Sequence, residues 1–314
     1  MGLFNRFRDT VIYKEDNELE NKIRILKELR EKYPENDKIK NDLKLAEIGL
    51  KGEKNIEFEL KNANIGMYVL HDITLRYEDL VSQIDYIVIT PARNYFIECK
   101  NIVGKIIVDE NGNFERKSEY FKDKSMYSPL TQAERHINIF IKGWRQRHGK
   151  LDNFLYEKYL DKWNVPLVVI ANDETILDVK KAPSDIKNKI IKHDQLIRYL
   201  KNDIKYLKKS ELTTQKDMKK IADGFLELND PVKIDYEKLY ITEVETLKNK
   251  LLEFRSKKAK ERIIPEDYIF TNEELDNILK KLPKLVEDLT DILPEVKQKL
   301  HGQEIIDIIK ENMQ

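Results

Sequence analysis

The chain has a single cysteine, Cys99, among its 314 residues. One cysteine excludes intrachain disulfides and zinc sites that are built from several cysteines. No apolar run approaches the roughly 20 residues that cross a bilayer, and no signal-peptide pattern is visible. We therefore expect a cytoplasmic protein that makes no contact with a membrane.

The chain also lacks net charge, because 57 Lys and Arg residues balance 57 Asp and Glu residues. Nucleic-acid-binding proteins often carry a basic excess, so its absence argues mildly against tight nonspecific binding. Two stretches are locally basic: residues 201–220, with seven lysines against three acids, and Trp144–Lys150. Either could follow a phosphate backbone, although a solvated helix face is the commoner explanation. The 40% hydrophobic fraction supports the cores of two or three domains.

One hairpin pattern carries most of the functional information. Residues 84–90 and 95–100 are short apolar runs typical of strands, and the turn-rich tetrapeptide PARN joins them. Asp85 lies at the start of the first strand, and Glu98 and Lys100 lie near the end of the second. The pattern therefore predicts a β-hairpin with two carboxylates and one ammonium group at the same end.

The spacing of these residues has chemical consequences. Side chains two apart on a strand share a face, so Glu98 and Lys100 lie together and Cys99 points to the other face. Two carboxylates can hold Mg²⁺ or Mn²⁺, and a neighbouring lysine can direct a metal-bound water toward a phosphodiester. The simpler alternative is a solvated cross-strand ion pair between Asp85 and Lys100. For Cys99, a small buried hydrophobic residue is favoured over a catalytic thiol.

The flanking segments give the order of the other elements. Ile56 and Leu60 mark one face of a helix, with Glu53 near its first turn. A helix is also expected from Ser128, because Pro129 suits a first helical position. Strands are expected at Met67–Ile73, at Gly104–Asp109 as a third strand of the hairpin system, and at Val165–Ala171 as a buried strand.

This order resembles the nuclease-related domain (NERD), a branch of the PD-(D/E)xK nuclease superfamily, over about Ala46–Tyr199. The matching motifs are Gly52-Glu53, Gln83–Ile89 (QIDYIVI), Ile97–Ile106 (IECKNIVGKI) and Ser128–Gln132 (SPLTQ). The chain departs from the family pattern at Tyr86, where His is usual, at Cys99, where an apolar residue is usual, and at Ser128, where Asn is usual. None of these departures removes a charged position of the motif.

The resemblance implies an α/β fold, namely a restriction-endonuclease-like mixed sheet flanked by helices. It also implies a nuclease that depends on Mg²⁺ or Mn²⁺ and acts on nucleic acid, with DNA expected over RNA. Asp85, Glu98 and Glu53 would hold the metal, Lys100 would act on the attacking water and the phosphate, and Gln132 would support the site or contact the substrate. The alternative is a catalytically silent module that binds nucleic acid or a partner protein.

Three further residues near these motifs are considered for the site: Glu57, His71 and His136. Glu57 lies one helical turn after Glu53 and replaces it as candidate ligand if the helix alignment is shifted. His71 and His136 are interpreted as structural residues, because one ends an apolar strand and the other lies on a helix beside Ile137.

Helical segments precede and follow the nuclease-like region. Apolar stripes at helical spacing, interrupted at Pro34, predict an N-terminal helical hairpin that packs on the core or on a second copy of the chain. The C-terminal residues resemble an HRDC domain, the helical accessory module of helicases and nucleases. The matching segments are Leu247–Ala259, Ile264-Pro265, Tyr268–Thr271, Leu275 with Pro283, and Gly302 with Ile305.

The HRDC-like segment departs from its family at one turn. Ile292–Val296 contains no glycine, and Pro294 has no N–H to offer a phosphate. From Ile241 onward there are 13 basic residues against 16 acidic ones. A protein-contact role is therefore nearly as well supported as DNA binding. The expected divisions are an N-terminal helical region (1–45), a nuclease-like domain (46–205), a linker with helical parts (206–238) and the HRDC-like domain (239–314).

Overall fold

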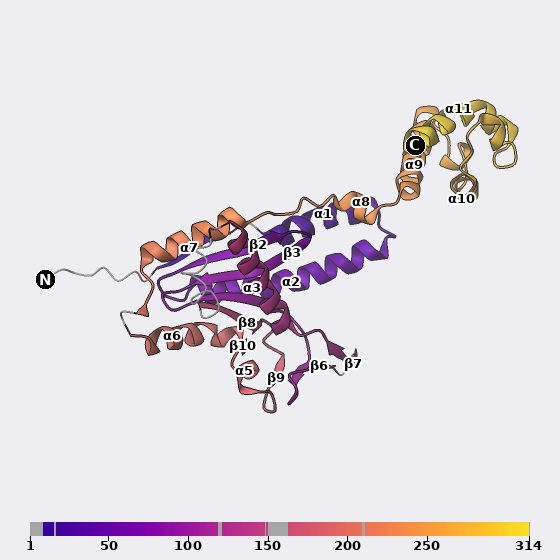
Figure 1. The fold of residues 1–314 in the computed structure, drawn as a ribbon. Helices are drawn as coiled ribbons and strands as arrows, with labels where there is room; N and C mark the ends of the chain where they lie inside the picture. The colour runs from indigo at the N-terminus through magenta and orange to yellow at the C-terminus, as the bar shows by residue number, and fades with distance from the viewer. Residues whose placement is uncertain are drawn as a thin grey trace. The chain divides into compact units, whose positions relative to one another are not determined.

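The computed structural model describes residues 9–15, 17–118, 121–147, 149, 163–208 and 211–313. Parts of both basic stretches noted above, 201–220 and 144–150, lie outside the described residues. The chain forms two compact units, Met1–Ile234 and Asp235–Gln314 (Figure 1). Since residue 45 falls inside a continuous helix, no element ends at the first predicted boundary. The finer domain boundaries stay predictions.

The first unit is built on a six-stranded mixed sheet with the order β1-β2-β3-β4-β8-β10. Its antiparallel centre is β2-β3-β4, and the pairs β1–β2, β4–β8 and β8–β10 are parallel. The strands are β1 (Thr10–Lys14), β2 (Met67–Tyr77), β3 (Leu80–Ile89), β4 (Asn94–Lys100), β8 (Asn164–Ile170) and β10 (Ile190–Lys192).

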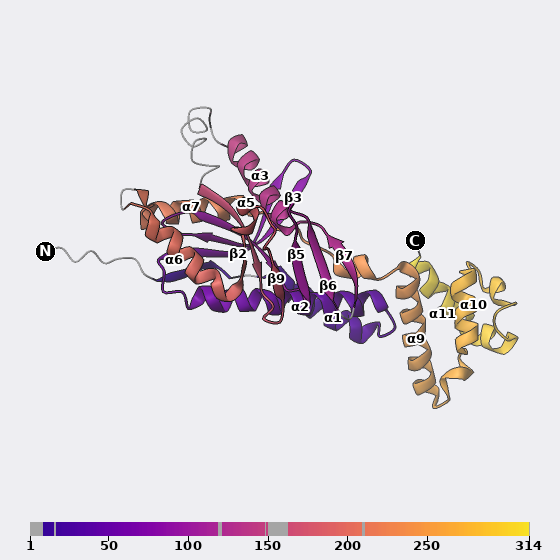
Figure 2. The same cartoon turned by 90° about the horizontal axis from the view of Figure 1, so that it is seen from below.

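Helices cover both faces of this sheet (Figure 2). The larger helices of the unit are α1 (Glu18–Lys32), α2 (Asp37–Lys61), α3 (Pro129–Arg147), α6 (Leu196–Tyr206) and α7 (Gln215–Leu228), with the short α5 (Ser184–Lys187) and η1 (His193–Gln195). Residues of α2 and α6 form one core with alternate strand residues, and residues of α3 and α7 form the other core. The predicted α/β fold with a mixed sheet between helices is confirmed.

The sequences of the strands agree with their positions in the sheet. β8 reads NVPLVVI and pairs with a strand on each side, so nearly all of its side chains are buried between the helix layers. The predicted hairpin is also present, because β3 and β4 pair antiparallel and Thr90 N donates to Arg93 O at 2.9 Å across the turn. β3 begins at Leu80, however, so Asp85 lies within the strand and not at its start.

A second sheet corrects one sequence expectation. The strand expected at Gly104–Asp109 is β5, and it pairs outside the main hairpin, in a four-stranded sheet with the order β7-β6-β5-β9. Its strands are β5 (Lys105–Val108), β6 (Phe114–Ser118), β7 (Phe121–Met126) and β9 (Ile176–Asp178). Gly104 has a positive φ of 109°, so the chain turns there and leaves the direction of β4.

Two elements of the first unit have places in the sheet layers that the sequence patterns did not show. β1 pairs parallel with β2 and brings the N-terminal segment onto the edge of the main sheet. Residues 206–238, expected to be a linker with helical parts, contain α7, whose buried face includes Met218, Ala222 and Phe225. α7 is therefore part of the sheet's covering layer.

The second unit has its own apolar core and is entirely helical in the residues that the structure describes. Its elements are α8 (Tyr236–Tyr240), α9 (Glu243–Arg262), η3 (Glu266–Tyr268), α10 (Asn272–Lys281), η4 (Val286–Leu289) and α11 (Glu295–Asn312). A capping box begins α10, because Thr271 and Glu274 exchange hydrogen bonds there. In the turn that lacks glycine, the N–H groups of Ile292 and Leu293 both donate to Leu289 O. These two N–H groups are therefore already used within the protein.

The length and hydropathy of the helices decide whether any of them could cross a membrane. In the part of the chain that the structure describes, no helix is long and apolar enough to cross a bilayer.

Gly52 lies where α2 packs closely against the end of β4, and this packing can be tested by adding a side chain there. A Cβ at Gly52 would lie 2.6 Å from Asn101 Cβ and 3.3 Å from Ala171 Cβ, whereas a Cβ at Gly49 would lie 3.4 Å from Leu19 Cδ2. We expect Gly52→Ala to lower the free energy of unfolding by about 1–3 kcal/mol through overpacking. Gly49→Ala should leave it unchanged or raise it by up to about 1 kcal/mol through helix propensity. Urea unfolding of both variants measures this, and equal stabilities would contradict the packing argument.

Candidate active site

The candidate site lies where two strands of the hairpin separate. The β3–β4 pairing ends at Tyr86 and Ile97, while β3 continues beside β2 as far as Leu80. Asp72, on β2, adopts a left-handed conformation with φ 56°. Asp85 is the first residue of β3 beyond this fork. The fork therefore leaves backbone N–H groups of β4 without a strand partner on that side.

Asp85 satisfies one of these donors with its side chain. Its Oδ2 accepts a hydrogen bond from Cys99 N at 2.7 Å. No hydrogen bond joins its other oxygen to any residue that the structure describes. Burial raises the pKa of Asp85 well above its usual value, and the negative charges of Glu98 and Glu53 raise it further. Three acidic side chains predicted for the site therefore act on one another electrostatically.

Glu98 is the most buried of the three carboxylates, with its side chain 3% exposed. Its Oε1 lies 2.5 Å from Lys100 Nζ, as the shared strand face predicts. Lys100 Nζ also donates to Gln132 Oε1 at 3.3 Å, which connects β4 to the first turns of α3. The side chain of Lys100 is 25% exposed, so its ammonium group is reachable from solvent.

The second oxygen of Glu98 is held by a residue that was interpreted as structural. His136 Nε2 lies 3.2 Å from Glu98 Oε2, and His136 Nδ1 is hydrogen-bonded to Ser82 Oγ. The pattern is satisfied when the Ser82 hydroxyl donates to Nδ1 and the Nε2–H donates to Glu98. The signal available in the sequence was spacing, because Gln132 and His136 are four residues apart and share a helix face.

Glu53 reaches the site from α2. Because α2 begins at Asp37, Glu53 lies in the middle of a long helix and not near a first turn, as expected from the sequence. Its Oε2 lies 2.9 Å from His71 Nε2 and accepts from Asn17 Nδ2 at 3.0 Å. Both histidines interpreted as structural thus contact a carboxylate of the candidate site.

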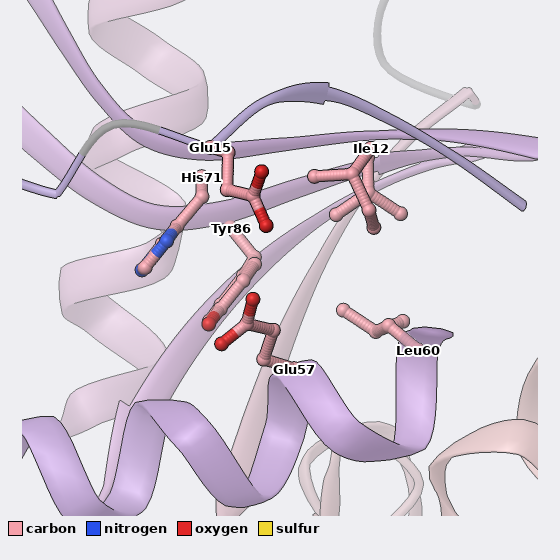
Figure 3. Close-up of a pocket in the computed structure, with 7 residues that line it drawn as sticks. Ile12, Glu15, Glu57, Leu60, His71 and Tyr86 are labelled. Carbon is pink, nitrogen blue, oxygen red and sulfur yellow. The ribbon is translucent and has the colours of Figure 1, made fainter. Parts of the chain in front are cut away.

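Glu57 contacts other residues than Glu53 does. Its carboxylate is 2.5 Å from Lys61 Nζ, and it lines a crevice together with Glu15, His71 and Tyr86 (Figure 3). The His71 and Tyr86 rings are stacked with centroids 4.3 Å apart. The crevice is too narrow to admit a water molecule. Glu57 therefore has an ion-pair partner on its own helix, and the crevice beside it has no room for a ligand.

The side chain of Cys99 has the environment of a structural residue. It packs against the core between α2 and the sheet. Burial raises the pKa of its thiol well above the usual value, and the charges of Asp85 and Glu53 act in the same direction. The thiol form is therefore favoured over the nucleophilic thiolate.

The donor set at the fork suits a hard divalent cation. Carboxylate oxygens are the ligands that Mg²⁺ prefers, and one or two of them with several waters are enough. A cation would also relieve the repulsion that raises the pKa of Asp85. Among the described residues, however, no three His, Cys, Asp or Glu side chains are arranged to ligate one ion together. The residues fit the ion by chemistry, with Glu53 and Glu98 engaged by protein donors in this arrangement.

A cavity of about 950 Å³ lies elsewhere on the first unit. It is lined by the first residues of β4 and β8, whereas Glu98 and Lys100 lie at the last residues of β4. Its lining includes Asn94, Trp144, Trp163, Asn164 and Phe225. The candidate site is thus an open strand end and is separate from this cavity.

Comparison with known families divides the chain as the sequence motifs do. The family model of the nuclease-related domain matches residues 48–171, and that of the HRDC domain matches residues 245–309. These matches indicate nuclease-related function and nucleic-acid binding at a coarse level. No curated protein and no solved structure matches the chain.

The raised pKa of Asp85 predicts how pH affects stability. The unfolded chain releases this proton near the usual pKa of 3.8, and the folded chain releases it at higher pH, so stability is lost as pH rises through the folded-state pKa. Asp85→Asn removes this loss and can still accept the Cys99 N–H. In EDTA we expect the variant to melt above the wild type at pH 7, with a difference that shrinks toward pH 4. Calorimetry measures this, and a variant less stable at every pH would contradict it.

Proposed function

Because the chain carries a NERD domain followed by an HRDC domain, we propose that it is a divalent-metal-dependent nuclease. The reaction is hydrolysis of phosphodiester bonds in nucleic acid, with DNA favoured over RNA. The observation that carries the proposal is the contact between Glu98 and Lys100 at 2.5 Å, beside an Asp85 whose pKa is raised by burial and by the charge of Glu98. A cluster of charges this close and this buried is costly unless it serves a ligand or a reaction.

Asp85, Glu98 and Glu53 are the proposed ligands of Mg²⁺ or Mn²⁺. When bound, the ion supplies charge neutralisation for the phosphate and a water of lowered pKa. Glu98 is oriented for this role from both sides, since Lys100 holds one oxygen and His136 holds the other. Second-sphere contacts of this kind set the orientation of a ligating carboxylate.

Lys100 is the proposed catalytic cation. Its ammonium group is partly exposed and is held by Glu98 and Gln132, so it keeps a fixed position while it can still reach substrate. In that position it would orient the attacking water and stabilise the negative charge that develops on the phosphate. Gln132 acts through Lys100 and is therefore a positioning residue.

The alternative is a nuclease fold that binds nucleic acid or a protein without cleaving it. The observation that favours it is the lack, among the described residues, of a three-residue metal-ligating cluster. From Ile241 onward, the balance of 16 acids to 13 bases favours a protein partner over nucleic acid. Self-association through the N- or C-terminal helices also belongs to this reading.

Cleavage assays separate the two readings. The purified protein is incubated with single-stranded, duplex and circular DNA and with RNA, in Mg²⁺, Mn²⁺ or EDTA. We expect cleavage of DNA that requires the metal and that falls by about 10²–10³-fold in Lys100→Ala, as for loss of one transition-state donor. Lys105→Ala is the matched control. Lys105, on β5, forms an ion pair with Asp178 at 2.8 Å and has no role in the proposed mechanism.

Two outcomes would overturn the mechanism. Equal cleavage by wild type and Lys100→Ala would make this lysine an ion-pair partner only. Binding of nucleic acid without cleavage under any metal condition would favour the silent module.

The C-terminal unit makes a separate prediction about binding. Deleting residues 235–314 should weaken nucleic-acid binding and flatten its salt dependence by about 0.9 units of slope for each lost contact with a duplex phosphate. The acidic balance of the unit leads us to expect a small effect. Fluorescence anisotropy at several salt concentrations measures the slope, and unchanged binding would assign the unit to a protein partner.

A further inference from the structure

The position of Glu53 depends on a residue that lies before the matched nuclease-related domain. We propose that the β1–α1 segment completes the active site and that Asn17 is a positioning residue for Glu53. This inference rests on the proposed function, because it gives Glu53 the role of a metal ligand. The matched domain begins at residue 48, so Asn17 lies outside it.

Asn17 uses both ends of its amide group. Its Oδ1 accepts from Leu19 N at 2.8 Å and caps α1, while its Nδ2 donates to Glu53 Oε2 at 3.0 Å. The cap fixes the amide plane, because one geometry must serve both hydrogen bonds. The start of α1 therefore sets where the donor points.

His71 contacts the same oxygen of Glu53. With His71 Nε2 at 2.9 Å and Asn17 Nδ2 at 3.0 Å, Oε2 is held by two groups from different elements. No hydrogen bond joins Oε1 to any residue that the structure describes. Anchoring one oxygen leaves the other available for a metal, in the way that outer contacts orient a ligating carboxylate.

The segment that carries Asn17 is itself tied to the fork. Lys14 Nζ donates to His71 O at 2.9 Å and to Asp72 O at 2.8 Å. Glu18 N donates to Asp72 Oδ2 at 2.6 Å, and Gln83 Nε2 donates to Asp72 Oδ1 at 2.8 Å. These contacts hold the start of α1 against the strands that carry His71 and Asp85, so Asn17 has a defined position relative to both.

The test separates the two functions of Asn17. Asn17→Ser keeps a good helix cap and removes the donor to Glu53, and Asn17→Asp keeps the cap and places a second negative charge beside Glu53. Asn36 is the matched control, since its side chain caps α2 by accepting from Ile39 N at 3.1 Å. It lies about 25 Å along the helix axis from Glu53, at about 1.5 Å per residue. The control variants are Asn36→Ser and Asn36→Asp.

The primary readout is the Mn²⁺ dissociation constant, measured by calorimetry on the full chain, with melting temperature as the check on folding. We expect Asn17→Ser to weaken Mn²⁺ binding by about 10- to 100-fold, as for other outer-sphere partners of a metal site. Asn17→Asp also loses this donor but adds a negative charge that attracts the cation, so it should weaken Mn²⁺ binding less than Asn17→Ser does. The Asn36 variants should bind Mn²⁺ as the wild type does and melt at temperatures similar to those of the Asn17 variants.

The outcomes distinguish this inference from the proposed function. Wild-type protein that binds Mn²⁺ and cleaves DNA, together with Asn17 variants that match the Asn36 variants in affinity, would overturn the role of Asn17 alone. Wild-type protein that neither binds Mn²⁺ nor cleaves would overturn the proposed function, and the inference with it. If an Asn17 variant melts well below its Asn36 counterpart and binds Mn²⁺ normally, the residue is only structural, and the inference also fails.

Discussion

The separation of β3 from β4 at Tyr86 and Ile97 is the constraint on which the candidate site depends. Where the ladder ends, a backbone donor of β4 loses its strand partner, and the Asp85 carboxylate accepts that N–H. A buried donor without a partner costs free energy, so the fork requires an acceptor at this point. The acceptor is an acid, and it lies close enough to Glu98 for the two charges to interact.

Different groups of the protein contact each carboxylate of this cluster. Glu98 has a cation on one oxygen and His136 on the other. Glu53 has two donors on one oxygen, and one of them, Asn17, comes from the N-terminal segment. Asp85 has a single backbone donor, and its raised pKa records the charge that the protein leaves uncompensated. A divalent cation is the ligand that we propose for this arrangement, because it would supply the missing positive charge.

Local patterns predicted the elements whose interactions are local. The β3–β4 hairpin is set by residues a few positions apart, and the Glu98–Lys100 contact follows from strand alternation. The strand β1 was missed, and the packing of α7 on the sheet was not foreseen, because their apolar faces have meaning only against β2, which lies far away in the chain. The second sheet was misplaced for the same reason, since β5 pairs in parallel with a strand some 70 residues later.

The sequence alone determined that Glu98 and Lys100 share one face of a strand, because strand periodicity depends only on neighbouring residues. Tertiary structure decided which groups hold those side chains in place. His136 and Asn17 reach Glu98 and Glu53 only after helices α3 and α1 pack against the sheet. Contacts between residues 36 or 38 positions apart leave no periodic signal in a single sequence, so packing had to reveal them.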